Sequence, residues 1–202
     1  LLSGYNPKTL NKTTLLESFS GLSAGTQYYC RIRALNINSS ASVYSNVIQF
    51  LTKPNTPVLN SISNSEIDQT SFLIGWSLVP GIADDYQVEV SSTDFSITTT
   101  LLMGYPLTVV SNSINVGVDA GTSPLAPGTM YWVRIRSRNS SGESPESNVL
   151  IVLTKAATPV LNSTSPLDIT QTTSLISWNG VTGMIDNYNI EVSSTDFTIT
   201  TT

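Results

Sequence analysis

The stretch LAPGTMYWVRIRSRN, from Leu125 to Asn139, says most about the fold. Turn-forming residues come first, and then Tyr131, Val133 and Ile135 alternate with a tryptophan and two arginines. Because successive side chains of a β-strand point to opposite faces, this alternation predicts a strand with an apolar inner face and a polar outer face. The stretch LSAGTQYYCRIRALN, from Leu22 to Asn36, repeats the pattern 103 positions earlier.

The whole chain of 202 residues is internally repetitive. Segment 56–100 is identical to segment 158–202 at 28 of 45 positions, without a gap. A period of about 100 residues is the size of a whole domain and is too long for a solenoid unit. We therefore expect the C-terminal part of one unit at 1–55, a complete unit at 56–156 and the N-terminal part of a further unit at 157–202.

Short strand-like runs separated by turn residues follow one another through the complete unit. No stretch of useful length shows helical periodicity. Seven or so strands at this spacing predict a two-sheet antiparallel sandwich. The expected strands are 57–63, 72–76, 86–90, 95–103, 107–118, 131–135 and 147–154.

A family resemblance follows from Trp76 in the second strand, the third strand YQVEV and the stretch LAPGTMYWVRIRSRN. Together they resemble the fibronectin type III domain, and the likeness recurs in every unit. It implies an all-β fold of tandem, immunoglobulin-like antiparallel β-sandwiches. It also implies that Tyr131 packs its ring inward and bonds its hydroxyl to nearby backbone, with Leu125 as an apolar anchor. The core residues implied are Trp76, Tyr86, Leu125 and Tyr131 in the complete unit and Leu22, Tyr28, Trp178 and Tyr188 in the partial units.

A second set of residues alternates with these core positions and faces outward from the same strands. A tryptophan flanked by cations can stack on a sugar ring or hold an acidic ligand. The interpretation that we favour is that guanidinium groups stack on Trp132 and cover it, which is worth about 0.5–1 kcal/mol at an exposed site. The outer-face residues are Trp132, Arg134 and Arg136 in the complete unit and Tyr29, Arg31 and Arg33 in the first partial unit.

Carboxylates offer a second set of candidate site residues. Glu89 and Glu191 alternate with core positions, so we expect them to face outward, solvated or paired with arginine. Asp84, Asp85 and Asp186 lie in the turn before the third strand, and turn chemistry explains them. They lack the spacing of a tight calcium-binding loop.

The remaining candidates are explained by local structure. Cys30 occupies the position of Val133 in the next unit, so we expect a small buried residue without a redox role. Asp94 and Asp196, in the repeated sequence STDF, are expected at turns or strand ends. In a chain this rich in Ser, Thr and Asn, N-x-S/T sequons are only a weak indication of glycosylation. They occur at Asn11, Asn38, Asn139 and Asn162.

Composition argues against several functional classes. Only 11% of the residues are charged and the net charge is −5, which disfavours binding to DNA, RNA or an anionic membrane. Without histidine, neither a Ser-His nor a Cys-His nucleophile can form, and zinc loses a common ligand. No apolar run approaches the roughly 20 residues that span a bilayer. We expect no enzyme activity, cofactor or metal, and no membrane insertion by this segment.

The junctions between units are short. In LTKPNTP and LTKAATP only two residues separate the sequence LTK from the sequence TP. A linker of this length cannot act as a flexible tether, so neighbouring units must nearly touch. With units about 30 Å long, the expected array is a semi-rigid rod.

Two functional interpretations stay open. Near-identical repeats that are acidic and rich in Asn, Ser and Thr resemble giant bacterial surface adhesins of the Bacteroidota type, which implies an extracellular or cell-surface stalk for attachment or gliding. The alternative is a ligand-binding accessory module of a secreted polysaccharide-degrading enzyme, with surface polysaccharide as its partner. The partial units are expected either to be a window on a longer array, with neighbouring repeats as partners, or to complete one another between head-to-tail copies in a filament.

Overall fold

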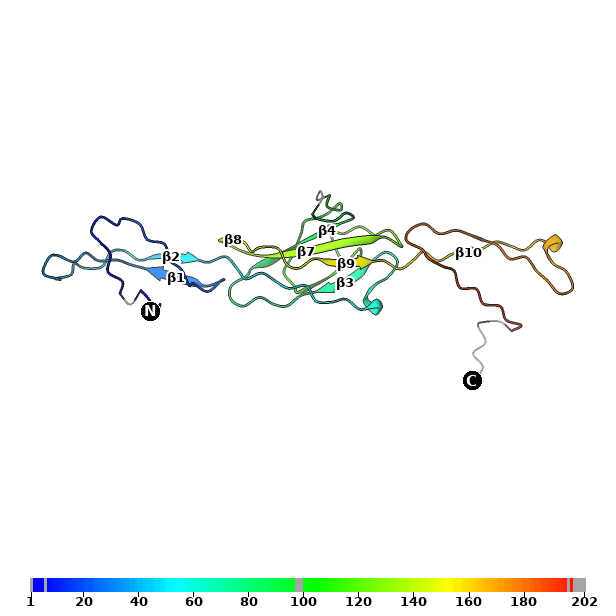
Figure 1. The fold of residues 1–202 in the computed structure, drawn as a ribbon, viewed down its shortest axis with the longest axis horizontal. Helices are drawn as coiled ribbons and strands as arrows, with labels where there is room; N and C mark the ends of the chain where they lie inside the picture. Colours follow the sequence, from blue (N-terminus) through cyan, green and yellow to red (C-terminus); the bar gives the residue numbers. More distant parts are fainter. Residues whose placement is uncertain (1, 6, 97–99, 196, 198–202) are drawn as a thin grey trace.

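The computed structural model describes residues 2–5, 7–96, 100–195 and 197. The molecule is long and narrow, and its three segments lie end to end (Figure 1). We call them the N-terminal segment (1–55), the central domain (56–156) and the C-terminal segment (157–202). In the described residues the regular structure is almost entirely β-strand, apart from the single-turn 3₁₀ helices η1 (Asn64–Glu66) and η2 (Pro166–Asp168).

The central domain consists of two antiparallel sheets that enclose one core. Its strands are β3 (Phe72–Gly75), β4 (Asp85–Ser91), β5 (Leu107–Val109), β6 (Ser113–Val116), β7 (Met130–Asn139), β8 (Gly142–Glu143) and β9 (Leu150–Leu153). The larger sheet has the order β5-β4-β7-β8, and β9 pairs with the first half of β7. The smaller sheet pairs β3 with β6. The predicted all-β antiparallel fold is confirmed.

Alternating residues from both sheets fill the core of the central domain. Along β7 the odd-numbered residues are buried and the even-numbered residues are half-buried, as the sequence alternation predicts. Trp76 is 1% exposed, and its ring contacts that of Tyr86 edge-to-face with centroids 5.3 Å apart. Burying one such apolar side chain stabilises the fold by about 1.5–3 kcal/mol. The core comprises Leu59, Phe72, Ile74, Trp76, Tyr86, Val88, Val90, Ile114, Val116, Leu125, Tyr131, Val133, Ile135 and Val152.

The prediction of a first strand over 57–63 is wrong. This segment reaches the smaller sheet through an isolated bridge between Leu59 and Trp76. Asn148 takes the place of a neighbouring strand, because its side chain accepts from the Leu59 N–H (2.8 Å) and donates to the Leu59 carbonyl (3.2 Å). Pro57 also lacks the N–H that a ladder would need.

Two further predicted strands differ from the structure. The segment 95–103 touches the sheet through the bridge from Leu101 to Ser91, and residues 97–99 of that prediction lie outside the described residues. The predicted strand 107–118 is divided into β5 and β6, which belong to different sheets. The short connection at 110–112 lets the chain cross from one sheet to the other.

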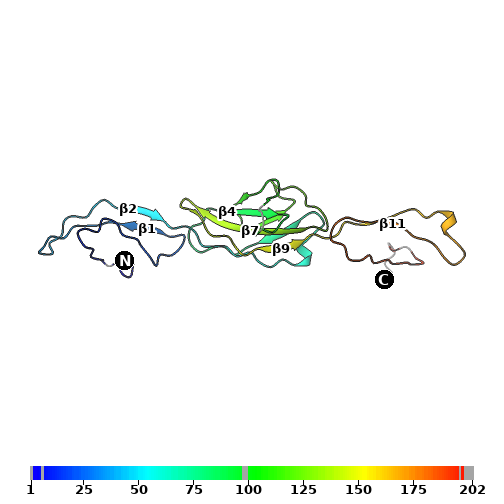
Figure 2. The same ribbon diagram turned by 45° about the horizontal axis from the view of Figure 1, so that its top comes forward.

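Each flanking segment holds one pair of strands and remains open on one side (Figure 2). In the N-terminal segment β1 (Gln27–Cys30) pairs with β2 (Ile48–Leu51). In the C-terminal segment β10 (Val160–Leu161) pairs with β11 (Trp178–Asn179). No second sheet covers either pair within the described residues, so most of their side chains are exposed.

The predicted core of the flanking segments is therefore wrong in its burial. Trp178 and Tyr188 are 36% and 40% exposed. Leu22, Tyr28 and Cys30 are half-buried, although each corresponds to a fully buried position of the central domain. The physical reason is that a strand pair buries only the contacts it makes itself, and the facing sheet supplies the rest. No helix within the described ranges has the length and apolar character needed to span a bilayer.

Candidate functional site

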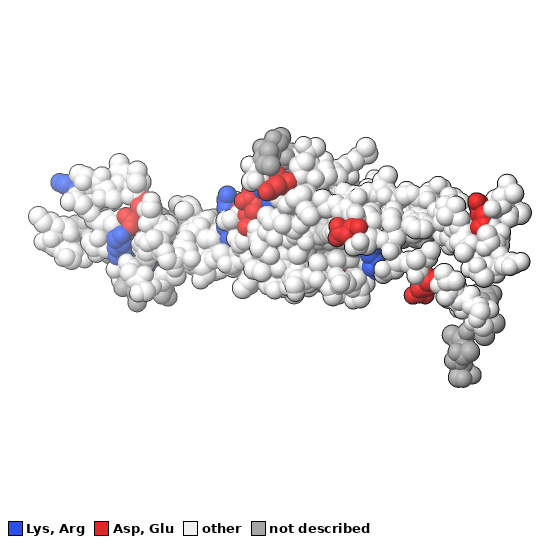
Figure 3. Space-filling model, turned by 45° about the vertical axis from the view of Figure 1, so that its right-hand side comes forward, with Lys and Arg blue, Asp and Glu red and all other residues white. Residues whose placement is uncertain are grey.

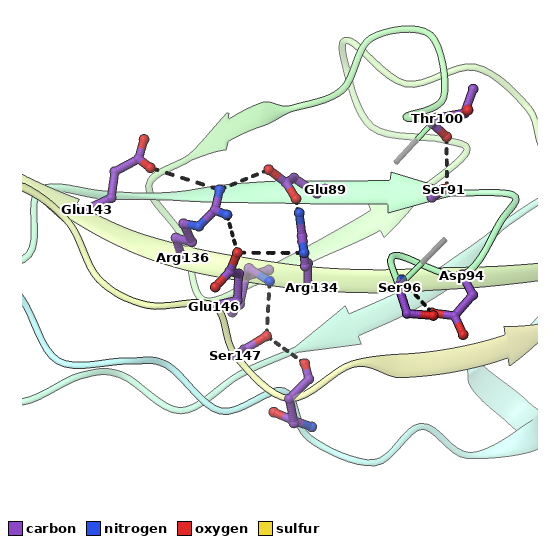
Figure 4. A network of polar contacts seen from close by, with 12 residues as sticks. Glu89, Ser91, Asp94, Ser96, Thr100, Arg134, Arg136, Glu143, Glu146 and Ser147 are labelled. Carbon is purple, nitrogen blue, oxygen red and sulfur yellow. Dashed lines mark hydrogen bonds and ion pairs between the residues drawn. The ribbon is translucent and has the colours of Figure 1, made fainter. Parts of the chain in front are cut away.

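Ion pairs join β4 and β7 on the outer face of the large sheet (Figure 4). Glu89 on β4 stands directly opposite Arg134 on β7. Its carboxylate accepts from Arg134 Nε at 2.5 Å and from Arg136 Nη1 at 3.0 Å. With both oxygens engaged, Glu89 is only 8% exposed. The predicted pairing of Glu89 with arginine is confirmed.

Two glutamates that follow β7 complete this network. Glu146 Oε1 accepts from Arg136 Nη2 at 2.5 Å and lies 3.6 Å from Arg134 Nη1, and Glu143 Oε2 lies 3.9 Å from Arg136 Nη1. Hydrogen bonds from its own backbone N–H and from Arg136 lower the pKa of Glu146. Burial lowers the pKa of Arg136, but the Glu146 hydrogen bond and the surrounding carboxylates raise it more, so the net shift is upward. The arginines are charged and already partnered, which leaves little attraction for an acidic ligand.

Trp132 lies beside this network without joining it. It is half-exposed and pairs in register with Ser91 of β4 and Ile151 of β9. The guanidinium group of Arg134 lies over the ring of Phe95, 4.2 Å from its centroid. The predicted stacking of arginine on Trp132 is therefore wrong for Arg134, because Phe95, just after β4, takes that place.

The N-terminal segment has the matching outer-face residues, but their exposure and their side-chain partners differ from those in the central domain. Tyr29 is 68% exposed. The guanidinium groups of Arg31 and Arg33 lie 3.8 and 5.0 Å from the ring centroid of Tyr44. Tyr44 occupies the position of Glu146, since each residue directly precedes the sequence SN. Within the described residues no carboxylate forms an ion pair with either arginine.

Glu191 is the counterpart of Glu89 in the C-terminal segment. Its side chain is exposed, and the described part of the chain offers it no ion pair. The structure thus brings the Glu–Arg–Arg group together in the central domain alone. In the flanking segments its parts lie at opposite ends of the molecule (Figure 1).

A second ion pair on β4 and β7 was not expected from the sequence. Asp85 accepts two hydrogen bonds from Arg138, at 2.6 Å from Nε and 3.1 Å from Nη2. The hydrogen bond to Asp85 raises the pKa of Arg138. The detectable signal was the alternation itself, because the arginines of β7 continue in step to Arg138. The prediction that turn chemistry explains Asp85 is therefore incomplete.

Other candidate residues take local roles. Asp94 Oδ1 accepts from the Ser96 N–H at 3.0 Å, which confirms its predicted turn role, whereas Asp196 lies outside the described residues. Among the described residues no group of three or more cysteine, aspartate or glutamate side chains could hold a metal ion. The sequon residues Asn11, Asn38 and Asn162 are exposed.

Comparison with known proteins identifies the central domain. Residues 56–152 match the fibronectin type III domain family. This segment is a fibronectin type III domain. The chain is also 30% identical over 155 residues to human "Fibronectin type-III domain-containing protein 3A", which covers 72% of this chain and 12% of the human protein. The mouse protein of the same name is 30% identical over 143 residues, which is 69% of this chain and 11% of that protein.

The chain is also similar in part to solved structures that contain fibronectin type III domains. A segment of two fibronectin type III domains from chicken tenascin has a TM-score of 0.44 at 24% identity and covers 66% of this chain and 68% of that chain. The FN1–FN3 domains of chicken CNTN1 have a TM-score of 0.40 at 18% identity and cover 69% and 46%. The chain spans about an eighth of the curated relatives that it matches. Because those relatives are vertebrate proteins, the bacterial adhesin context stays a prediction. The absence of enzyme activity also stays a prediction.

Proposed function

We propose that this chain is a non-catalytic part of a tandem fibronectin type III array, which forms a semi-rigid stalk or filament of a secreted or surface-anchored adhesin. The observation that carries the proposal is the end-to-end arrangement of the three segments (Figures 1 and 2). Both linkers are also hydrogen-bonded to the central domain. The work of each unit is reach and display.

The first linker is held on both sides. The carbonyl of Asn55 accepts from the Ser137 hydroxyl at 2.5 Å, and its side-chain amide donates to the Pro80 carbonyl at 3.1 Å. Pro54 and Pro57, on either side of it, are buried. Because proline fixes one backbone dihedral, and the backbone carbonyl and side-chain amide nitrogen of Asn55 are both hydrogen-bonded, this linker has little freedom to bend.

The second linker is held by the end of the central domain. The Gln69 side chain donates to the Thr158 hydroxyl at 2.8 Å, and the Lys155 N–H donates to the Asp68 carbonyl at 3.0 Å. The Lys155–Asp68 ion pair at 3.4 Å is exposed and adds little. The hydrogen bonds themselves restrict this linker.

The surface supports a role in display. In the view of Figure 3 charged side chains form small separate groups, and most of the surface belongs to uncharged residues. The face in this view has no continuous basic track of the kind that binds nucleic acid. Its hydroxyl- and amide-rich composition is common in extracellular β proteins, which supports a cell-surface location.

Small-angle X-ray scattering of the 202-residue chain tests the rod. Three units of about 30 Å in line predict a maximum dimension of roughly 90 Å. A compact chain of this length would have a radius of gyration of about 17 Å. A measured radius of gyration of about 17 Å would contradict the proposal.

Trp132 supports the second candidate, a carbohydrate-binding accessory module. It is half-buried on the outer face of β7, the face that also carries the already partnered Arg134 and Arg136. Retention on insoluble polysaccharide that is lost in Trp132→Ala, with the fold intact, would favour this candidate. Under the stalk proposal the substitution changes stability modestly and there is no retention to lose.

For partners, we propose that the open faces of the flanking segments accept one another between copies of the chain. The C-terminal segment has the counterparts of β3, which belongs to the smaller sheet, and of β4, which pairs with β7 in the larger sheet. It carries Glu191 where β4 has Glu89. Arg31 and Arg33 in the N-terminal segment occupy the positions that correspond to Arg134 and Arg136. Docking would therefore rebuild the Glu–Arg–Arg group and bury both exposed aromatic faces.

Sedimentation velocity over a wide concentration range tests this docking. Wild type is expected to associate with rising concentration, and Glu191→Lys is expected to weaken that association. Asp186→Lys is the matched control, because it makes the same charge change at another exposed residue of the same segment. A monomeric wild type, or equal association of both variants, would overturn the proposal.

A further inference from the structure

The same backbone contact occurs at both junctions. At the first, the Ile82 N–H donates to the Gly25 carbonyl at 2.7 Å. At the second, the Met184 N–H donates to the Gly128 carbonyl at 2.7 Å. Gly25 and Gly128 end the equivalent corners LSAG and LAPG, so we call them the corner glycines. Each hydrogen bond joins one unit to the next.

Two further glycines, Gly81 and Gly183, directly precede the donors of these bonds, and we call them the turn glycines. Their φ angles are +84° and +109°, a region that favours glycine. A Cβ on Gly81 would lie 2.7 Å from the Gly25 carbonyl oxygen, and one on Gly183 would lie 2.7 Å from that of Gly128. Any side chain would therefore push the two units apart.

Hydrogen bonds with the residues just after the last strand of each unit hold the corner glycines in place. The Thr52 hydroxyl donates to the Ser23 carbonyl at 2.7 Å, and its counterpart Thr154 donates to the Ala126 carbonyl at 2.7 Å. The N–H of each corner glycine donates to the lysine carbonyl that follows the threonine, at 2.8 and 2.9 Å. These bonds leave the carbonyl of the corner glycine to face the next unit.

The linkers do not explain this repeated contact. The first linker is Pro54-Asn55 and the second is Ala156-Ala157, which differ in size, in polarity and in backbone freedom. Both junctions nevertheless have the same donor position, the same acceptor position and the same distance. The contact therefore belongs to the corner and the turn of the units themselves.

Asn139 adds a side-chain contact at the first junction. Its amide nitrogen donates to the Thr52 carbonyl of one unit at 2.9 Å and to the Ile82 carbonyl of the next at 3.1 Å. Asn139 is 8% exposed. The sequon nitrogen is thus committed to the junction, and a glycan on it would be incompatible with this packing.

We infer that the corner and turn glycines form a docking surface, the glycine latch, by which one fibronectin type III unit recognises the next unit of its own kind. The latch fixes the angle between units. Its partner is a repeat that has glycine at the corner and in the turn before its third strand. The inference rests on the proposed stalk function and supplies the source of its stiffness.

Alanine variants with a matched control test the latch. Gly25→Ala would place a Cβ 2.8 Å from the Ile82 nitrogen, and Gly81→Ala would place one against the Gly25 oxygen. Gly21→Ala is the control, because Gly21 has a φ of +70° close to the +57° of Gly25, but no heavy atom within 4 Å of its would-be Cβ. The control reproduces the backbone strain without the clash between units.

Double electron–electron resonance on the full chain gives the readout. Spin labels at Ser40→Cys and Val110→Cys, two exposed positions in different units, are introduced in a Cys30→Ser background. Wild type and Gly21→Ala are expected to give one narrow distance distribution, and the latch variants a broadened one. Thermal unfolding of the central domain checks that Gly81→Ala still folds, and Gly25→Ala lies outside that domain.

The outcomes separate the latch from the stalk. A narrow distribution in Gly25→Ala, like that of the control, overturns the latch while an extended scattering profile keeps the stalk. A broad distribution or a compact profile in the wild type overturns the stalk and the latch together. Broadening in Gly21→Ala equal to that in Gly25→Ala would also overturn the latch, because backbone strain alone would then explain the effect.

Discussion

The central domain and the C-terminal segment carry the same tryptophan–tyrosine pair in different surroundings. The rings of Trp76 and Tyr86 meet edge-to-face at 5.3 Å and 64°, and those of Trp178 and Tyr188 meet at 5.5 Å and 60°. Trp76 is 1% exposed, whereas Trp178 is 36% exposed. The residues close to the pair set its geometry, and the other strands of the sandwich set its burial.

The corner tyrosines make the same point. The Tyr131 hydroxyl accepts from the Ala126 N–H at 2.9 Å, and the Tyr28 hydroxyl accepts from the Ser23 N–H at 2.8 Å. Tyr131 is buried and Tyr28 is half-buried. This hydrogen bond joins residues five positions apart in the sequence. It is therefore local, and it forms whether or not a complete sandwich surrounds the tyrosine. Stability should therefore respond to substitution in the central domain far more than at the matching flanking position.

The largest expected effect is at the tryptophan. Trp76→Ala removes a fully buried ring and should destabilise the central domain by about 3–5 kcal/mol, a large part of a typical domain's stability. Trp178→Ala should leave the unfolding of the central domain unchanged. Urea denaturation followed by circular dichroism measures both. Equal losses in the two variants would mean that the segments unfold as one unit and would break the comparison.

The next effect is at the glutamate. Glu89→Gln leaves Arg134 and Arg136 without the charge between them, and hydrogen bonds to charged groups are worth about 1.5–3 kcal/mol. Glu191→Gln, at the exposed counterpart, should leave central-domain stability unchanged. The midpoint of urea unfolding gives the difference. If the loss of stability in Glu89→Gln is smaller than the experimental error, the attraction between Glu89 and the two arginines does no more than balance the cost of removing these charges from water.

Local pattern was enough to predict much of this molecule. Alternation along 131–135 gave the inner and outer faces of β7, and the resemblance gave Trp76 and Tyr86 as core residues. Alternation cannot say whether a facing sheet is present, so Trp178 was placed in a core that the structure does not contain.

Long-range side-chain contacts were beyond the sequence for a related reason. Asn148 replaces a strand partner of Leu59 from 89 positions away. Asp85 meets Arg138 from 53 positions away. The Asn148 contact leaves no periodic signal near its own residues, and the alternation along β7 marks Arg138 as outward-facing without indicating its partner. The corner and turn glycines of the latch leave no periodic signal either. Turn chemistry explains a glycine such as Gly81 equally well without any contact to another unit.

A smaller effect is expected at the corner tyrosine. Tyr131→Phe leaves the Ala126 N–H without its acceptor, and a lost hydrogen bond of this kind costs about 1 kcal/mol. Tyr28→Phe, where solvent can replace the hydroxyl, should have no effect on the central domain. Thermal unfolding of both variants provides the measurement. If Tyr131→Phe has the same stability as wild type, the hydrogen bond of the Tyr131 hydroxyl does not contribute to the stability of the central domain.

The smallest effect is a pH dependence at Glu146, where the N-terminal segment has the uncharged Tyr44 instead. The pKa of Glu146 is held below its ordinary 4.5 by hydrogen bonds from its own backbone and from Arg136. A lowered pKa stabilises the fold fully above the unfolded value, and this contribution is lost as the pH falls through the folded value. The side chain is 44% exposed, so solvent screening limits the contribution to about 0.5 kcal/mol. Glu146→Gln should therefore lower the Tm slightly at pH 7 and narrow the drop in Tm between pH 7 and pH 3, because the variant has no charge to lose. An identical drop in variant and wild type would assign the acid sensitivity of the central domain to its other carboxylates.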